Sequence, residues 1–402
     1  MVVLRRSGKE AYRQYAGLGL YITFVSIGAF LFLGLCVLPA LLSGPSAAGA
    51  MITAFCCAMP PLLVYLWLPW VIDRYDPEPW WCLALALMWG GLGAVGYAAT
   101  INTAVMSVAA QACGGEQCGE AIGACLSAPP VEEGLKGLGV FGFFYFLHRE
   151  FDGVVDGIIY ATFIALGFAA TENVVYYANA ILDPHQTLAG NFFVRGVLGP
   201  WGHPLYTSMT GIGFGVARET TKKWLKWMAP IGGYCAAMFL HFTWNFTSSI
   251  SSGLWLVMLP LWFILVALFF GLIIWLVRRK GKIIRQFLND EVLMGTLTRW
   301  ELELVCSAFG RMKATTSYGG KTGRVFVATA ARLGLSKWHT TRAQKGRAMT
   351  VSADFIVPLR QELFRLREEI ARLRGGNIER PQAWAAQAAQ QAPPTNPQGR
   401  YL

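Results

Sequence analysis

Acidic residues stand at the start of a long apolar stretch in this 402-residue sequence, directly after a pair of prolines. Glu132, Glu133 and Lys136 are spaced so that, on a helix, Lys136 lies one turn beyond both carboxylates and can neutralise one of them. The other carboxylate would remain available to activate water. A plainer alternative is that the two acids only suit the positive end of a helix.

Further ionisable residues lie within or at the ends of later apolar stretches. Glu172 and Asn173 come near the end of one stretch, and His203 opens the next. His241 and Asn245 are four residues apart in a third stretch, so they share one helix face. Each residue alone could be a satisfied structural partner. Because ionisable side chains are costly at membrane depth, their occurrence together favours a functional site.

The elements that must position these groups are membrane helices. The mean hydropathy is +0.43 and only 14% of the residues are charged, whereas soluble domains are about a quarter charged. Several apolar blocks reach the roughly 20 residues needed to cross a bilayer. We therefore predict an all-α fold, a polytopic membrane helix bundle with about eight transmembrane helices. The predicted spans are 17–42, 48–71, 80–108, 124–147, 154–178, 200–217, 227–248 and 254–277.

The net charge of +11 is distributed as topology requires. Basic residues gather at the N-terminus, between the sixth and seventh spans, and after the last span, which are cytoplasmic places in an eight-span arrangement. Arg195 is the only Lys or Arg in the predicted outer loops. We predict that both termini are cytoplasmic and that the first apolar stretch is a signal anchor in place of a cleaved signal peptide. The expected partner is the lipid bilayer, and no nucleic-acid partner is expected.

This topology brings the polar groups to one level. Glu132 and Glu133 begin a helix that enters from the outside, and Glu172 ends a helix that runs outward. His203 begins an inward helix, and His241 lies in the last turns of an outward one. Four antiparallel helices thus deliver these groups to the extracytoplasmic side of the bilayer centre. Glycines in these spans favour close helix packing around them.

The ordered motifs resemble the PrsW family of intramembrane proteases, which is distantly similar to the CAAX prenyl-protease and ABI group. The resemblance covers roughly 71–246 and rests on the motifs around the residues named above, together with Phe151-Asp152-Gly153, Gly167-Phe168-Ala169 and the segment Asp73–Pro79. It implies an endopeptidase of the bacterial plasma membrane that cleaves membrane-associated proteins, anti-sigma factors among them, near the extracytoplasmic face.

We hypothesise that a water molecule activated between a glutamate and a histidine hydrolyses the peptide bond, with a role for each polar group. Glu132 or Glu133 would be the general base, with Lys136 tuning it, and His203 would position the water. His241 and Asn245 would donate hydrogen bonds to the developing oxyanion. Glu172 and Asn173 would orient these groups.

Zn²⁺ is a candidate cofactor, with Glu133, Glu172, His203 and His241 as ligands and Glu132 as a substitute for Glu133. A metal-free glutamate mechanism is the other interpretation, and both stay open. The main alternative to a protease is a proton-coupled transporter or channel that uses the same buried Glu and His residues. A membrane scaffold whose tail binds a partner is the third interpretation.

The chain divides into a cytoplasmic N-terminus at 1–16, the protease-like membrane domain at 17–277, a basic helical tail at 278–374 and a disordered end at 375–402. Thr298 and Glu301 have the spacing of a capping box, and a second tail helix is expected around Pro358–Arg374. The tail is assigned no chemistry. Cys113, Cys118 and Cys125 lie near one outer connection and favour one disulfide of open pairing.

Overall fold

A computed structural model describes residues 8–72, 75–147, 149–250, 252–307, 309–345 and 351–373, and within these ranges the regular elements are helices only. They form two compact units. The larger unit contains residues 6–73 and 78–274, and is called the bundle here. Its elements are α1 (Gly8–Phe32), η1 (Leu33–Val37), α2 (Leu38–Leu42), α3 (Pro45–Ile72), α4 (Trp80–Met88), η2 (Trp89–Ala94), α5 (Val95–Cys113), α6 (Glu116–Ile122), η3 (Gly123–Ser127), α7 (Ala128–Phe146), α8 (Val154–Leu182), α9 (Leu188–Phe192), η4 (Phe193–Leu198), α10 (Gly202–Glu219), α11 (Lys223–Ile250) and the first part of α12 (Ser252–Leu293).

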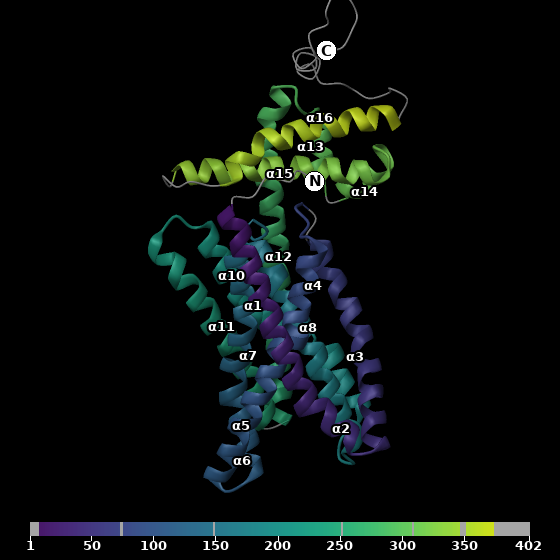
Figure 1. Cartoon of the computed structure of the whole chain (residues 1–402), viewed down its shortest axis with the longest axis vertical. Coiled ribbons are helices and arrows are strands. Elements are labelled where there is room, and N and C mark those ends of the chain that lie inside the picture. The colour runs from purple at the N-terminus through teal and green to yellow at the C-terminus, as the bar shows by residue number, and fades with distance from the viewer. Residues whose placement is uncertain are drawn as a thin grey trace, which may run out of the picture. The chain divides into compact units, whose positions relative to one another are not determined.

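Helix α8 lies at the centre of the bundle, with other helices on every side (Figure 1). Within its most apolar stretch 89% of the residues are buried, against 17% for the peripheral α1. Three apolar clusters each include a different part of α8, packed in turn against α4 and α7, against α1 and α5, and against α3. An apolar helix enclosed in this way is a rigid support for the residues it carries.

Helices α8 and α10 approach each other through glycines. A Cβ atom on Gly157 would lie 2.2 Å from the backbone oxygen of Gly211, and a Cβ on Gly211 would lie 2.2 Å from the oxygen of Gly157. Such backbone contact is possible only without side chains at both positions. The glycines thus allow the close helix packing that the sequence favours, at a crossing about four turns from Glu172 along α8.

Five helices in the described part of the chain are long and apolar enough to cross a membrane. They are Tyr12–Leu42, Pro45–Trp67, Trp80–Cys113, Val154–Leu182 and Gly253–Leu293. All eight predicted spans coincide with helices, but α7, α10 and α11 are outside this set. Their polar side chains explain why: these are the helices that carry Glu132, His203 and His241. A multi-pass membrane bundle is confirmed, and the count of eight stays a prediction.

Two basic residues meet at the C-terminal end of α7. Arg13 donates a hydrogen bond to the backbone oxygen of Tyr145, and Arg218 donates one to that of Phe144. Both oxygens belong to the last turn of the helix, where carbonyls lack intrahelical partners. The basic N-terminal segment and the basic segment after α10 are therefore at the same end of the bundle, as the predicted topology requires. Its orientation in the membrane remains a prediction.

Several helices contain a wide π-type turn with one extra residue. In η2, the first residue, Trp89, donates its indole N–H to the backbone oxygen of Leu135 at 2.9 Å. A Cβ on Gly139 would lie 2.4 Å from the same indole. Trp89 therefore holds α7 in place directly beside Lys136. Turn η3 leads into α7 just before its two prolines.

The connection between α5 and α6, predicted to be extracytoplasmic, contains a disulfide between Cys113 and Cys118, and Cys125 is a free thiol. The sequence left the pairing among these three cysteines open.

At the start of α8, Asp156 is buried and accepts hydrogen bonds from the backbone N–H groups of Asp152 and Gly153 at 2.8 and 3.1 Å. Asp156 is thus a helix-capping residue.

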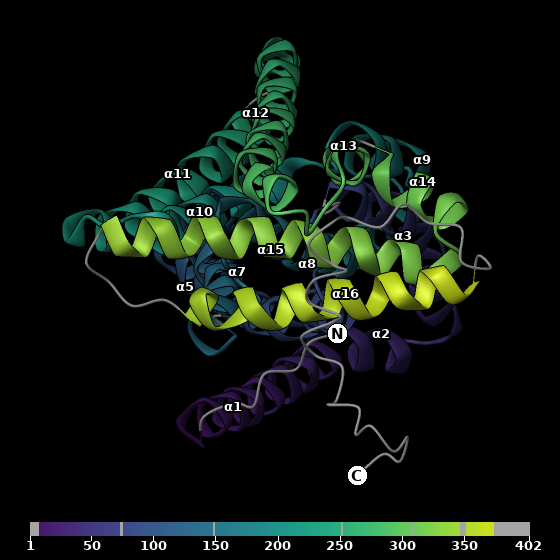
Figure 2. The same cartoon turned by 90° about the horizontal axis from the view of Figure 1, so that it is seen from above.

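The smaller unit contains the described residues from Trp275 onward together with 75–77. Its helices are the end of α12, α13 (Arg299–Cys306), α14 (Gly310–Ser317), α15 (Gly320–Lys345), the short η5 (Val351–Phe355) and α16 (Ile356–Leu373). Helices α15 and α16 lie side by side, which Figure 2 shows from above. Thr322 at the start of α15 donates to Glu369 near the end of α16, so the two helices are antiparallel.

Both predicted tail features are present. Thr298 and Glu301 form a reciprocal capping box, with contacts of 2.7 and 3.1 Å, and the expected second helix is α16. The long α15 was not predicted. The expected disorder of 375–402 lies outside the described residues. Asp76, in the segment singled out as a motif, accepts a hydrogen bond from Arg332 of α15 at 2.5 Å.

Candidate active site

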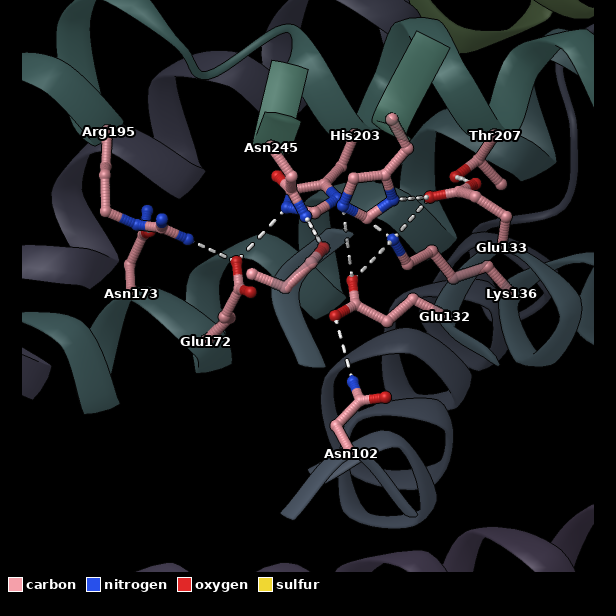
Figure 3. A network of polar contacts seen from close by, with 12 residues as sticks. Asn102, Glu132, Glu133, Lys136, Glu172, Asn173, Arg195, His203, Thr207 and Asn245 are labelled. Carbon is pink, nitrogen blue, oxygen red and sulfur yellow. Dashed lines mark hydrogen bonds and ion pairs between the residues drawn. The ribbon is translucent and has the colours of Figure 1, made fainter. Parts of the chain in front are cut away.

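The polar groups of four helices converge inside the bundle (Figure 3). Glu132, Glu133 and Lys136 come from the first turns of α7. Glu172 lies about five turns along α8, and His241 about five turns along α11, which runs in the same direction. His203 is the second residue of α10. With Arg195 of η4, these residues form a continuous set of hydrogen bonds and ion pairs, called here the site cluster.

Lys136 is the centre of the site cluster. Its ammonium lies 2.7 Å from Glu133 Oε1, 2.9 Å from His203 Nδ1 and 3.4 Å from Glu132 Oε2. The side chain is fully buried, and its nitrogen stands 4.1 Å from the centre of the Phe168 ring. The predicted neutralisation by Lys136 thus extends to both carboxylates of α7.

Glu133 is surrounded by donors. Its Oε1 accepts from Lys136 and from His241 Nδ1 at 3.1 Å, and its Oε2 accepts from Thr207 at 2.8 Å. The residue has no exposed surface. A carboxylate held on both oxygens in this way is suited to positioning its neighbours.

Glu132 has looser contacts. Its Oε1 lies 3.4 Å from the amide nitrogen of Asn102, and its Oε2 lies 3.4 Å from Lys136 and 3.9 Å from His241 Nε2. It is 5% exposed, whereas Glu133 is completely buried. Of the two carboxylates, Glu132 has the greater capacity to accept a further hydrogen bond.

Glu172 is paired with a cation that the sequence left unassigned. Arg195 forms an ion pair with its Oε2, and the same guanidinium donates to Asn173 Oδ1 at 2.7 Å. His203 Nε2 lies 3.1 Å from Glu172 Oε2. Because the ammonium of Lys136 donates to His203 Nδ1, the His203 proton is on Nε2 and faces Glu172.

His241 and Asn245 share a helix face but have separate partners. The imidazole of His241 donates from Nδ1 to Glu133 and stacks on the Tyr206 ring at 5.1 Å. Asn245 donates to the backbone oxygen of Ala124 in η3 at 2.7 Å. That contact ties α11 to the turn before α7. The oxyanion role predicted for Asn245 stays a prediction, and the observed contact supports a positioning role.

A set of donors suited to a metal ion is present, but its members differ from the predicted four. Ligand atoms of Glu132, His203 and His241 lie within 4.8 Å of one another. Glu133 and Glu172 instead support the two imidazoles as hydrogen-bond acceptors, an arrangement typical of metal-binding histidines. Two histidines and one carboxylate are the ligands of many catalytic zinc sites. The donor chemistry therefore fits zinc, while Lys136 contacts two of the three donors.

Four participants in this region were not assigned a role from the sequence. Asn102 bridges Ser127 and Glu132, with Ser127 Oγ donating to its Oδ1 at 2.8 Å. Thr207 follows His203 by one helical turn, a spacing that predicts a shared face. Asn102 is a polar residue in an apolar helix, and Arg195 is the only basic residue of the predicted outer loops. These sequence features mark Asn102, Thr207 and Arg195 as unusual, but they do not show which residues the three contact.

Comparisons with known proteins agree with the resemblance predicted from the motifs. Residues 78–276 match the model of the family described as PrsW family intramembrane metalloprotease. A "Protease PrsW" of Geobacillus kaustophilus is 35% identical over 113 residues, which are 27% of this chain and 46% of the relative. One of Oceanobacillus iheyensis is 30% identical over 121 residues, 30% of this chain and 52% of the relative. No solved structure matches the chain.

The chain spans about half the length of the curated relatives it matches. The matched region begins at Glu78 and extends into the apolar part of α12, beyond the predicted limit at 246. The tail from 277 onward is outside the match. The predicted family is thus confirmed for the segment that carries the site cluster.

Proposed function

We propose that this chain, whose residues 78–276 match the PrsW family of intramembrane metalloproteases, is an intramembrane endopeptidase that cleaves membrane-associated proteins. The observation that carries this proposal is the pair formed by Glu132 Oε2 and His241 Nε2, which lie 3.9 Å apart among buried groups. A separation of this size is one that a water molecule can bridge.

We assign the general base to Glu132. A water bound between Glu132 and His241 gives a proton to Glu132 as its oxygen attacks the peptide carbonyl carbon. When the carbon–nitrogen bond breaks, Glu132 returns that proton to the leaving amine. Glu133 fixes His241 by accepting from Nδ1, so Nε2 is an acceptor that orients the water. With this tautomer His241 positions the water, and the oxyanion role predicted for it is replaced.

The remaining groups set the charge and geometry. Three carboxylates of the site cluster face two cations, Lys136 and Arg195. Glu172 orients His203, which in turn holds Lys136. A metal ion held by Glu132, His203 and His241 would act as a Lewis acid toward the water or the carbonyl oxygen.

The proposed substrates are membrane-anchored proteins of the anti-sigma-factor type, cut near the extracytoplasmic face of a bacterial plasma membrane. The depth of the site cluster in the helices and the shared end of Arg13 and Arg218 support this orientation. Nothing in the comparisons supports the alternative of a proton-coupled transporter.

The test is cleavage of a panel of membrane-tethered reporters by the purified full-length protein in detergent or vesicles. Glu132→Ala, Glu133→Ala and His241→Ala should each abolish cleavage without loss of membrane insertion. Glu120→Gln, which removes an exposed carboxylate from α6, is the matched control and should cleave normally. A triple variant at Glu132, Glu133 and His241 with full activity would overturn the proposal.

A further inference from the structure

Lys136 has more partners than a simple counter-ion requires. An ammonium has three N–H bonds, and Glu133 Oε1, His203 Nδ1 and Glu132 Oε2 provide three acceptors at 2.7, 2.9 and 3.4 Å. The Phe168 ring covers it at 4.1 Å, which adds a favourable cation–π contact. Since the side chain is fully buried, water does not compete for these contacts.

Two of these three acceptors belong to the donor set that fits a metal ion. Glu132 and His203 are members of that set together with His241. His203 Nε2 is used by Glu172, so its lone pair is on Nδ1 and points at the ammonium. Zinc binds imidazole nitrogen and carboxylate oxygen at about 2.0–2.2 Å. A zinc ion and the ammonium would therefore compete for the Nδ1 lone pair of His203 and for the carboxylate of Glu132.

Charge adds to this competition. Two cations within a few ångströms repel strongly where water is scarce. Glu133 cannot serve as a ligand that bridges the two cations, because its oxygens already accept from Lys136, His241 and Thr207. Both cations cannot be accommodated in the observed arrangement.

We propose that Lys136 is the resident cation of the site cluster, and that its ammonium and a divalent metal ion exclude each other. Metal binds only when the Lys136 side chain leaves its three acceptors. This makes Lys136 a positioning residue that sets metal affinity, in addition to neutralising the carboxylates. The inference rests on the proposed function for the identity of the site, but metal binding is measurable without any substrate.

The experiment is equilibrium dialysis of full-length, metal-stripped protein against Zn²⁺, followed by metal analysis. The variant Lys136→Met removes the ammonium and keeps an unbranched side chain. Lys223→Met is the matched control, because Lys223 is an exposed lysine on α11. A third protein, Lys136→Met/His241→Ala, removes one proposed ligand as well.

Lys136→Met should bind one equivalent of Zn²⁺ at least about ten-fold more tightly than the wild type, within the usual range of coupling between two sites. Lys223→Met should match the wild type, and the double variant should lose the gained affinity. Equal Zn²⁺ affinity of the wild type and Lys136→Met would overturn the proposal, as would no specific Zn²⁺ binding by Lys136→Met. Zn²⁺ binding can be measured even if the protein cleaves no reporter. Failure of mutual exclusion and failure of the proposed protease function are therefore distinguishable.

Lys136→Met leaves two buried carboxylates with one cation fewer, and this change can prevent folding. Lys136→Met/Glu133→Gln keeps the charge balanced and retains an acceptor at position 133. Zn²⁺ should raise the thermal unfolding midpoint of this variant and leave that of Glu133→Gln nearly unchanged, because a ligand stabilises the state that binds it. Equal shifts in the two proteins would contradict mutual exclusion.

Discussion

Two clusters of ion pairs, the site cluster and a tail cluster, each surround buried carboxylates, and the contacts of those carboxylates differ. The tail cluster consists of Glu291, Glu301, Lys337, Arg360 and Arg367. Glu301 accepts from the Thr298 N–H at 2.7 Å, from Arg367 at 2.6 Å and from the Tyr318 hydroxyl at 3.1 Å. Glu291 accepts from Lys337 at 2.8 Å and from Arg360 at 2.6 Å.

In the site cluster only Glu133 is held as completely as these two carboxylates. Glu132 has two contacts of 3.4 Å and a neighbour at 3.9 Å. A buried carboxylate whose acceptor positions are filled contributes to geometry, whereas one with long contacts has capacity left for a reacting molecule. Contact length, more than burial, therefore separates the candidate base from the structural acids.

Glu132→Gln tests whether the loosely held carboxylate is the base, and it should reduce cleavage more than the other substitutions below. The amide has nearly the same shape but cannot take a proton, so kcat should fall about a thousand-fold. The thermal unfolding midpoint should stay close to that of the wild type, because the hydrogen bonds of the Glu132 carboxylate are long and weak. Cleavage kinetics and a melting curve on the same preparation measure both effects.

Arg367→Met should have the opposite profile. It removes the cation from buried Glu301 and should destabilise the tail unit by about 3–5 kcal/mol. Protease sensitivity of the tail in the full-length protein measures the loss, with Arg365→Met as the control at an exposed arginine. Cleavage of a tethered reporter should continue, and its complete loss would show that the two regions are not independent.

Gly157→Ala separates packing from chemistry within the bundle. The added Cβ would lie 2.2 Å from the Gly211 oxygen, so α8 and α10 must separate, at a cost of about 1–3 kcal/mol. Gly142→Ala, where the new Cβ would meet no neighbouring atom within 4 Å apart from its own stretch of helix, should leave stability unchanged or raise it slightly. Thermal unfolding of both variants in one detergent is the measurement, and equal midpoints would contradict the close crossing.

Thr207→Val has the smallest expected effect. It removes one donor from Glu133 and keeps the shape, at a cost of about 1 kcal/mol or somewhat more because an acceptor is left unpaired. Cleavage should slow several-fold, since Glu133 still holds His241. Reporter kinetics measure this slowing. A loss as large as the one expected for Glu132→Gln would contradict it and would indicate that Glu133 is the base.

The convergence of the site cluster could be predicted because depth along a helix follows directly from residue number. Glu172 and His203 have to be at one level if their helices are antiparallel neighbours. The roles of Glu132 and Glu133 could not be separated, because neighbouring residues of one helix differ only in side-chain contacts. The ion pair of Glu172 with Arg195 joins residues 23 positions apart through a connection whose path no local pattern predicts.

In the tail, too, local features could be predicted from the sequence and contacts between distant residues could not. The capping box of Thr298 and Glu301 is local, so its spacing was sufficient to predict it. Arg367 was not anticipated as a buried residue, because its partner Glu301 is 66 positions away in the chain. On the exposed face of α16, Arg365 and Glu369 are one helical turn apart and form an ion pair at 3.4 Å.

The wide turn η2 holds one residue more than an ordinary helical turn. Each residue of an ordinary helix turns the chain by about 100°. Because the wide turn absorbs its extra residue, deleting one residue between Trp89 and Ala94 would restore ordinary winding and leave the direction of α5 nearly unchanged. A deletion inside α5 before Asn102 cannot be absorbed in this way, and it would turn Asn102 by about 100° away from Glu132. The same loss of one residue is therefore tolerable in η2 and disruptive in the helix that follows it.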